Sequence, residues 1–242
     1  MAIANFPLIN TILSELEQVH KNIKGDISLQ RKDKKLALYI LTGRILTHCY
    51  AINNLLLNGF FGETGVIFRS VYETIFTAEY FNITDDDSED LRKWFNDEII
   101  KPGKVRKKQY NMLKNMLERS NIKTELSSPD NLNKYRKSID ELYRIASKYT
   151  HPTYKISKIN MHHYYLEFDY ACKEIKKDTS PPPYSFEQLI ITIINMFCMC
   201  KDTFKMDKTT YDKLRENVEL LDSHTQQYKS DNLGNSPPLT PS

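Results

Sequence analysis

The stretch from Gly62 to Phe81 constrains the fold most, because as a helix it would be apolar almost all the way round. A helix of that kind is expected inside a protein. The sequence places Arg69 and Glu73 within it, four residues apart and therefore on one face. Burying a charge costs several kcal/mol unless the group is paired and hydrogen-bonded. We therefore expect this pair either to hold a buried polar network together or to serve chemistry.

Apolar residues recur every three or four positions along much of the remaining chain, which predicts further amphipathic helices. Glycine is scarce, at seven in 242 residues, and this favours long helices over a turn-rich sheet protein. The expected helices cover residues 6–24, 36–58, 62–81, 91–99, 101–114, 128–151, 185–200 and 209–221. Residues 159–170 fit either a helix or a short extended stretch. The sequence predicts an all-α protein, a single-domain bundle of about eight helices over residues 1–221, with a polar, disordered tail over residues 222–242.

The longest strongly apolar run, Leu189–Cys200, falls short of the eighteen or more residues that span a bilayer. It predicts a core helix and no membrane partner. The four cysteines lack the paired spacing of a zinc site, which favours reduced thiols in a cytoplasmic protein. No phosphate-cradling glycine loop or nucleophile elbow occurs, which argues against nucleotide-dependent and acyl-transfer enzymes. We expect no cofactor and no metal; a metal site built from His151, His163 and Asp169 is the alternative.

Residues 101–114 form the most basic stretch of the chain. Cations that follow a helix can lie along a phosphate backbone, so this stretch predicts a nucleic-acid-binding surface. An ordinary solvated helix face is the alternative. The candidate residues are Lys101, Lys104, Arg106, Lys107 and Lys108.

Two histidines occupy informative positions. His48 lies on the apolar stripe of the predicted helix 36–58, one turn after Arg44, and fits a satisfied core histidine better than a catalytic one. His151 ends its predicted helix because Pro152 follows it. Arg144 precedes it by seven residues, nearly two turns, so both would lie on the same side of a continuous helix.

Arg144 and His151, separated by six residues, resemble the Arg-x(4 to 6)-His motif of the HEPN superfamily. These compact all-helical proteins include many prokaryotic toxin and phage-defence ribonucleases. Phe68–Glu73 and Ile145–Pro152 are also similar to an uncharacterised bacterial helical family with an Arg-x-x-x-Glu helix and a Ser-x-x-x-His-Pro segment. The resemblance covers residues 36–152.

This resemblance implies metal-independent RNA cleavage, usually by a homodimer in which two copies of the motif face each other. His151 would be the general acid or base for attack by a ribose 2′-hydroxyl, and Arg144 would stabilise the charge that develops on the phosphate. The residues implied to hold these two side chains in place are Arg69, Glu73, Ser147 and Tyr149.

A second class of function stays open. The chain could be a noncatalytic helical module that binds a nucleotide, an RNA or a protein partner, with the polar cluster tying helices together. As a toxin it could also have a protein partner of the antitoxin kind. A solvent-accessible His151 near Arg144 would favour the enzyme, whereas a buried His151 hydrogen-bonded to Glu73 would favour the module.

Overall fold

The computed structural model describes residues 6–58, 60–98, 100–119 and 186–233, together with 130–131, 133–134, 136–137, 140–141, 144, 161–162 and 167–168. Within these residues the α-helices are α1 (Phe6–Asn22), α2 (Lys34–Leu57), α3 (Phe61–Asn82), α4 (Glu89–Phe95), α5 (Pro102–Arg119), α8 (Phe186–Met199) and α9 (Lys208–Leu233). The described residues between 130 and 144 are also helical. The prediction of an all-α bundle of about eight helices is confirmed.

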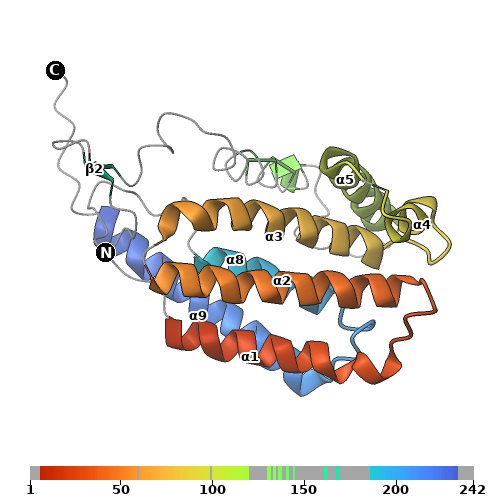
Figure 1. The fold of residues 1–242 in the computed structure, drawn as a ribbon, viewed down its shortest axis with the longest axis horizontal. Helices are drawn as coiled ribbons and strands as arrows, with labels where there is room; N and C mark the ends of the chain where they lie inside the picture. The colour runs from red at the N-terminus through yellow and green to blue at the C-terminus, as the bar shows by residue number, and fades with distance from the viewer. Residues whose placement is uncertain are drawn as a thin grey trace.

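Helices α2 and α3 form an antiparallel hairpin at the centre of the bundle (Figure 1). Asp33 caps α2, because its carboxylate accepts a hydrogen bond from the backbone N–H of Leu36 at 2.9 Å. The short connection between the two helices explains why they pack side by side along their whole length.

Helix α3 is buried on most sides, as expected for a helix that is apolar almost all the way round, but one row of it reaches solvent. Its buried faces meet α2, α5 and α8, and residues such as Val71 and Ile75 are fully buried there. The row through Val66, Arg69 and Glu73 is not covered to the same extent, and Val66 is 51% exposed. The charged pair therefore sits at the edge of the bundle, where solvent lowers the cost of its charges.

Helix α1 packs along α2 with the predicted stripe, of which Ile9, Ile12 and Leu16 are fully buried. In its last turn the ring of His20 stacks on Tyr39, with the ring centroids 4.2 Å apart. A Cβ atom at position 43 would lie 3.2 Å from His20 Nε2, so Gly43 permits this close approach. After α1 the chain makes a 3₁₀ turn at Lys24–Asp26.

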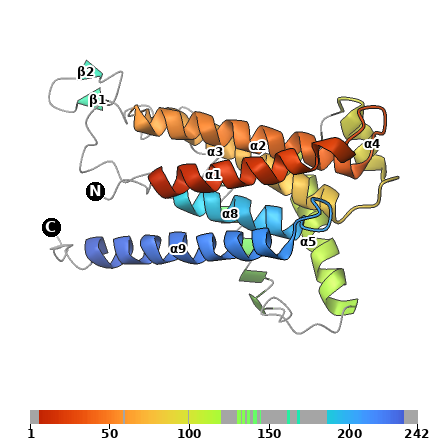
Figure 2. The same ribbon diagram turned by 90° about the horizontal axis from the view of Figure 1, so that it is seen from below.

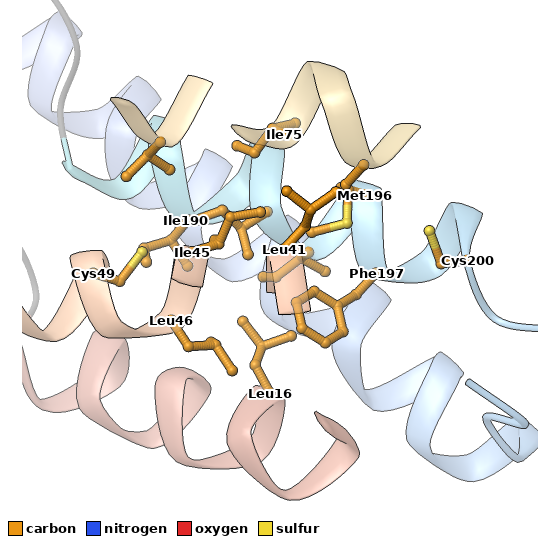
Figure 3. Close-up of a cluster of buried hydrophobic side chains, with 14 of the residues drawn as sticks. Leu16, Leu41, Ile45, Leu46, Cys49, Ile75, Ile190, Met196, Phe197 and Cys200 are labelled. Carbon is orange, nitrogen blue, oxygen red and sulfur yellow. The ribbon is translucent and has the colours of Figure 1, made fainter. Parts of the chain in front are cut away.

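The hydrophobic core lies where α1, α2, α3 and α8 meet. Figure 3 shows Leu16, Ile45, Ile75 and Phe197 gathered between these four helices, and each is fully buried. Cys200 adds a sulfur atom to the same region, and burial raises the pKa of its thiol. The prediction that the apolar run ending at Cys200 lies in the core is confirmed.

Helices α8 and α9 pack against each other, and Figure 2 shows α9 running along the outside of α8. The predicted end of the last helix at Leu221 was wrong, because α9 continues to Leu233. The added turns still contact α8: Thr225 is 4% exposed, and its hydroxyl lies 3.4 Å from Glu187 Oε2. Packing therefore keeps a polar stretch helical that composition assigned to a disordered tail. Residues 234–242 lie outside the described residues.

Helix α4 begins at a serine cap, where the Ser88 hydroxyl accepts a hydrogen bond from Leu91 N–H at 3.2 Å. It ends at Phe95 instead of continuing to Ile99. Asp97 adopts the left-handed conformation, with φ of 59°, which is a common way to end a helix. The chain then enters α5 at the end of the bundle (Figure 1).

Residues 161–162 and 167–168 form strands β1 (Met161–His162) and β2 (Glu167–Phe168), an antiparallel pair in which Met161 faces Phe168. The extended alternative for this stretch is therefore the correct one at these four positions. Among the described residues, no helix is both long and apolar enough to cross a membrane.

Candidate functional site

The predicted Arg69–Glu73 pair forms on α3. Arg69 Nε lies 3.0 Å from Glu73 Oε1, and the side chains are 28% and 31% exposed. The prediction that both groups share one face is confirmed. Because both are partly exposed, the contact contributes less to stability than a buried ion pair would. It fixes a guanidinium and a carboxylate on the outer row of the central helix.

The neighbouring row of α2 brings two more polar groups to this region. Arg44 Nη2 lies 3.4 Å from the hydroxyl of Ser70, which follows Arg69 on α3. One turn after Arg44, His48 is partly buried, and burial together with the nearby Arg44 charge lowers its pKa. Within the part of the chain that the structure describes, His48 Nδ1 has no hydrogen-bond partner. We expected a core histidine with both ring nitrogens hydrogen-bonded, and for Nδ1 that expectation was wrong.

Arg144 is exposed and pairs with Glu141 one turn before it. Its Nε donates to Glu141 Oε2 at 2.6 Å, and its Nη2 donates to Oε1 of the same carboxylate. This bidentate contact holds the plane of the guanidinium. His151, Ser147 and Tyr149 lie outside the described residues, so the predicted Arg144–His151 pairing stays a prediction.

The basic helix α5 is attached to α4 by one acidic residue that sequence reasoning missed. Asp90 is 2% exposed; its Oδ1 accepts from Lys104 Nζ at 3.2 Å, and its Oδ2 accepts from Lys108 Nζ. The Tyr80 hydroxyl of α3 also donates to Asp90 Oδ2, at 2.8 Å. Burial alone would raise the pKa of Asp90, but the hydrogen bonds from Lys108, Tyr80 and Lys104 outweigh it and lower the pKa to about 2.

The helical segment with described residues between 130 and 144 lies against α5. Arg106 Nε is 3.4 Å from Asp140 Oδ1, and the Tyr110 hydroxyl donates to Asn133 Oδ1 at 3.1 Å. The guanidinium of Arg136 sits over the Tyr110 ring, 5.1 Å from its centroid. Arg144 follows Asp140 by four residues and so lies on the same row of a helix. The structure thus packs the segment that bears Arg144 against the basic helix α5.

One further polar contact between α3 and α5 was not predicted. Glu79 is 6% exposed, and Gln109 Nε2 donates to its Oε2. Burial raises the pKa of Glu79 to about 7, and the hydrogen bond from Gln109 opposes that shift. The sequence did contain a signal for this contact, because Glu79 is a single carboxylate among apolar residues of the predicted central helix.

At this end of the molecule the described residues include several arginine and lysine side chains, the groups that proteins use to bind anions. Among the described residues, no group of three or more His, Cys, Asp or Glu side chains could hold a metal ion. The alternative metal ligands His151, His163 and Asp169 lie outside the described residues. Two buried acids contact α5: Asp90 through Lys104 and Lys108, and Glu79 through Gln109.

A family model described as "Family of unknown function (DUF5677)" matches residues 35–235. The match runs from the start of α2 to just beyond α9, so it contains every candidate residue above, whereas α1 lies outside it. Neither the search of curated proteins nor the search of solved structures gave a match. Because the model covers most of the chain, the protein belongs to this family of unknown function, DUF5677.

Proposed function

We propose that the protein is a metal-independent ribonuclease of a prokaryotic toxin or phage-defence system, with Arg144 and His151 as its catalytic residues. The proposal starts from the resemblance of the sequence to the HEPN superfamily. It draws support from the position of the Arg144 segment beside the most basic helix.

The observation that carries the proposal is the contact between α5 and the segment that bears Arg144. Arg106 meets Asp140 at 3.4 Å, and Tyr110 meets Asn133 at 3.1 Å, so the two helical stretches pack together. A polyanion bound along α5 would therefore run past Arg144. This arrangement is what an enzyme needs that both binds a phosphate backbone and stabilises one phosphate during the reaction.

The chemistry requires little beyond proton transfer and charge stabilisation. His151 removes the proton from a ribose 2′-hydroxyl, whose oxygen attacks the adjacent phosphorus. Arg144 stabilises the negative charge on the phosphate oxygens as the bond to the 5′-oxygen breaks. The 5′-oxygen takes up a proton as it leaves, and the products are a 2′,3′-cyclic phosphate and a 5′-hydroxyl.

Glu141 and the Arg69–Glu73 pair act as positioning residues in this proposal. Glu141 orients the guanidinium of Arg144, which is 55% exposed and so within reach of a phosphate. The phosphate competes with Glu141 for the same planar set of donors. Arg69 and Glu73 offer further donors and acceptors that support the imidazole, together with Ser147 and Tyr149.

A noncatalytic module that binds a nucleotide, an RNA or a protein is the second candidate function. The contact that favours it is the bidentate Glu141–Arg144 pair, which already satisfies the guanidinium of the proposed catalytic arginine. The engagement of Lys104 and Lys108 by Asp90 favours it as well. In that case RNA or a partner would bind without turnover.

The test is cleavage of total cellular RNA by the purified protein with a chelator present. We expect His151→Ala and Arg144→Ala each to lower the rate by about 10²–10⁴-fold, the usual loss for an acid–base or charge-stabilising group. Arg215→Ala serves as the control, since Arg215 is an exposed arginine of α9 that contacts Asn195 at 2.9 Å, away from the site. Circular dichroism checks that all variants are folded.

Retained cleavage in both variants would contradict the assignment of the two residues. No cleavage by the unaltered protein at any salt concentration would contradict the enzyme, and RNA binding measured on the same sample would then decide for or against the module. We further propose a cytoplasmic homodimer that a protein partner such as an antitoxin controls. Light scattering of the purified protein tests the dimer directly.

A further inference from the structure

The basic residues of α5 are not equivalent, because some of them are already used inside the fold. Lys104 and Lys108 share the buried carboxylate of Asp90. Their side chains remain 49% and 42% exposed, yet both ammonium groups lie at hydrogen-bond distance from that carboxylate. The hydrogen bond to Asp90 raises the pKa of Lys108, as expected for an ammonium group held by an anion. A phosphate would have to displace Asp90 to use either lysine.

Other cations of the same surface face outward. On α5, Val105 and Gln109 face the bundle, at 1% and 6% exposure, whereas Arg106 and Tyr110 face the neighbouring segment. Lys107 lies on the remaining side of the helix and is exposed. No carboxylate of the described residues forms an ion pair with it.

The neighbouring segment contributes cations to the same edge. Arg136 lies over Tyr110, and Lys137 follows it directly and is exposed. Like Lys107, Lys137 forms no ion pair with a carboxylate in the described part of the chain. Lys107 on α5 and Lys137 on the segment are thus exposed cations of two elements that pack together.

We propose that RNA crosses the edge formed by α5 and the 130–144 segment, with Lys107 and Lys137 contacting its phosphates, while Lys104 and Lys108 anchor α5 and do not contact it. This inference rests on the proposed RNA substrate. It separates lysines that form an ion pair with a buried carboxylate from lysines that are exposed to solvent. It also adds Lys137, from a different part of the sequence, to the binding surface.

The division can be measured from the salt dependence of binding. Each phosphate that the protein neutralises releases counterions, so removing one such lysine should reduce the slope of log K against log salt concentration by about 0.7 on a single strand. The probe is a fluorescent 2′-O-methyl oligoribonucleotide, which lacks the nucleophile for cleavage. Its anisotropy between about 50 and 200 mM NaCl therefore reports binding alone. The matched variants are Lys107→Ala/Lys137→Ala and Lys104→Ala/Lys108→Ala, which remove the same charge.

We expect Lys107→Ala/Lys137→Ala to reduce the slope by about 1.4 and to leave the melting temperature nearly unchanged. Lys104→Ala/Lys108→Ala should lower the melting temperature and leave the slope unchanged. An equal reduction of the slope in both variants, or a reduction confined to Lys104→Ala/Lys108→Ala, would overturn the division.

A third variant keeps the test valid if Lys104→Ala/Lys108→Ala partly unfolds the protein. Asp90→Asn releases Lys104 and Lys108 without removing either, so we expect tighter binding and a steeper slope from a protein that is folded by circular dichroism. An unchanged slope in folded Asp90→Asn would overturn the anchoring role. Binding with the expected slopes but no cleavage of ordinary RNA would refute the enzyme alone, whereas no binding by the unaltered protein at the lowest salt would refute both.

Discussion

Helix α3 packs against α8 and against α5 in two different ways. Toward α8 it presents apolar groups such as Ile75 and Phe68, and the Phe68 ring meets Phe186 edge-on with centroids 6.4 Å apart. Toward α5 it presents Glu79, whose partner is Gln109. Tyr80 donates to the carboxylate of Asp90 on α4, which in turn holds two lysines of α5. The first contact depends on the exclusion of water. The second depends on protonation and on ionic strength.

The difference separates an apolar frame from the polar contacts that hold the proposed binding surface. Apolar contacts between α3, α2 and α8 make a rigid frame that pH and salt hardly change. The polar contacts hold α5, and through Arg106 and Asp140 they reach the segment that bears Arg144. Conditions that change the charge of Glu79 or Asp90 should therefore alter the proposed binding surface before they alter the frame.

The largest effect should come from the apolar side. Ile75→Ala removes a fully buried side chain and leaves a cavity, so we expect the free energy of unfolding to fall by about 4 kcal/mol, independent of pH. Denaturant unfolding at several pH values measures this. Val66→Ala on the same helix is the control, since Val66 is 51% exposed and should change little. If the loss of unfolding free energy in Ile75→Ala depended strongly on pH, the contrast between the apolar and the polar side of α3 would be wrong.

On the polar side, Glu79→Gln should stabilise the protein at alkaline pH. The folded-state pKa of Glu79 is about 7, above the ordinary 4.5, so the unaltered protein loses stability as the pH rises through this range. The loss amounts to roughly 3 kcal/mol above pH 7, and the neutral glutamine avoids it. Melting curves at acid and alkaline pH compare the two proteins, with the exposed Glu216→Gln as control. If the Glu79→Gln variant and the unaltered protein were equally stable at alkaline pH, ionisation of Glu79 would not destabilise the fold.

Asp90→Asn should destabilise the contact between α4 and α5 by about 1–2 kcal/mol, an amount reduced by the solvent around the two lysines. Because the folded-state pKa of Asp90 is lowered to about 2, its contribution is present above pH 4 and is lost as the pH falls through 2. Melting temperatures at low and high salt test this, since salt should shrink the difference between the variant and the unaltered protein. The exposed Asp85→Asn provides the control.

The smallest effect should come from Lys93→Ala. Lys93 pairs with Glu89 at 2.5 Å, but this contact lies on the exposed face of α4. Solvent screens such pairs, so we expect no measurable change in melting temperature. A clear decrease in melting temperature would mean that exposed ion pairs stabilise the α4–α5 region as much as buried ones do.

Much of the fold follows from local patterns. The three-four stripe of Ile9, Ile12 and Leu16 predicted the face that α1 buries, and Ser88 is a typical capping residue at the start of α4. Both signals act within a few turns of one helix, so the sequence displays them directly. The end of α9 could not be predicted in this way, because contacts with Glu187 on α8 keep its later turns helical.

In the candidate site, too, contacts between near neighbours in the sequence could be predicted, and contacts between distant segments could not. The spacing of Arg69 and Glu73 predicted their contact, since four residues on a helix place two side chains together. Nothing in the spacing of Asp90, Lys104 and Lys108 distinguishes lysines that hold a buried carboxylate from lysines that face solvent. Their roles depend on how α4 meets α5.

The sequence by itself determined the helical class, the buried stripes and the pairing within α3, because periodicity and capping depend on near neighbours along the chain. The tertiary structure alone decided which charges are buried, which acids shift their pKa and which cations of α5 remain outward. Those properties arise when distant segments exclude water from one another, and the free energy of a charge depends on that local environment.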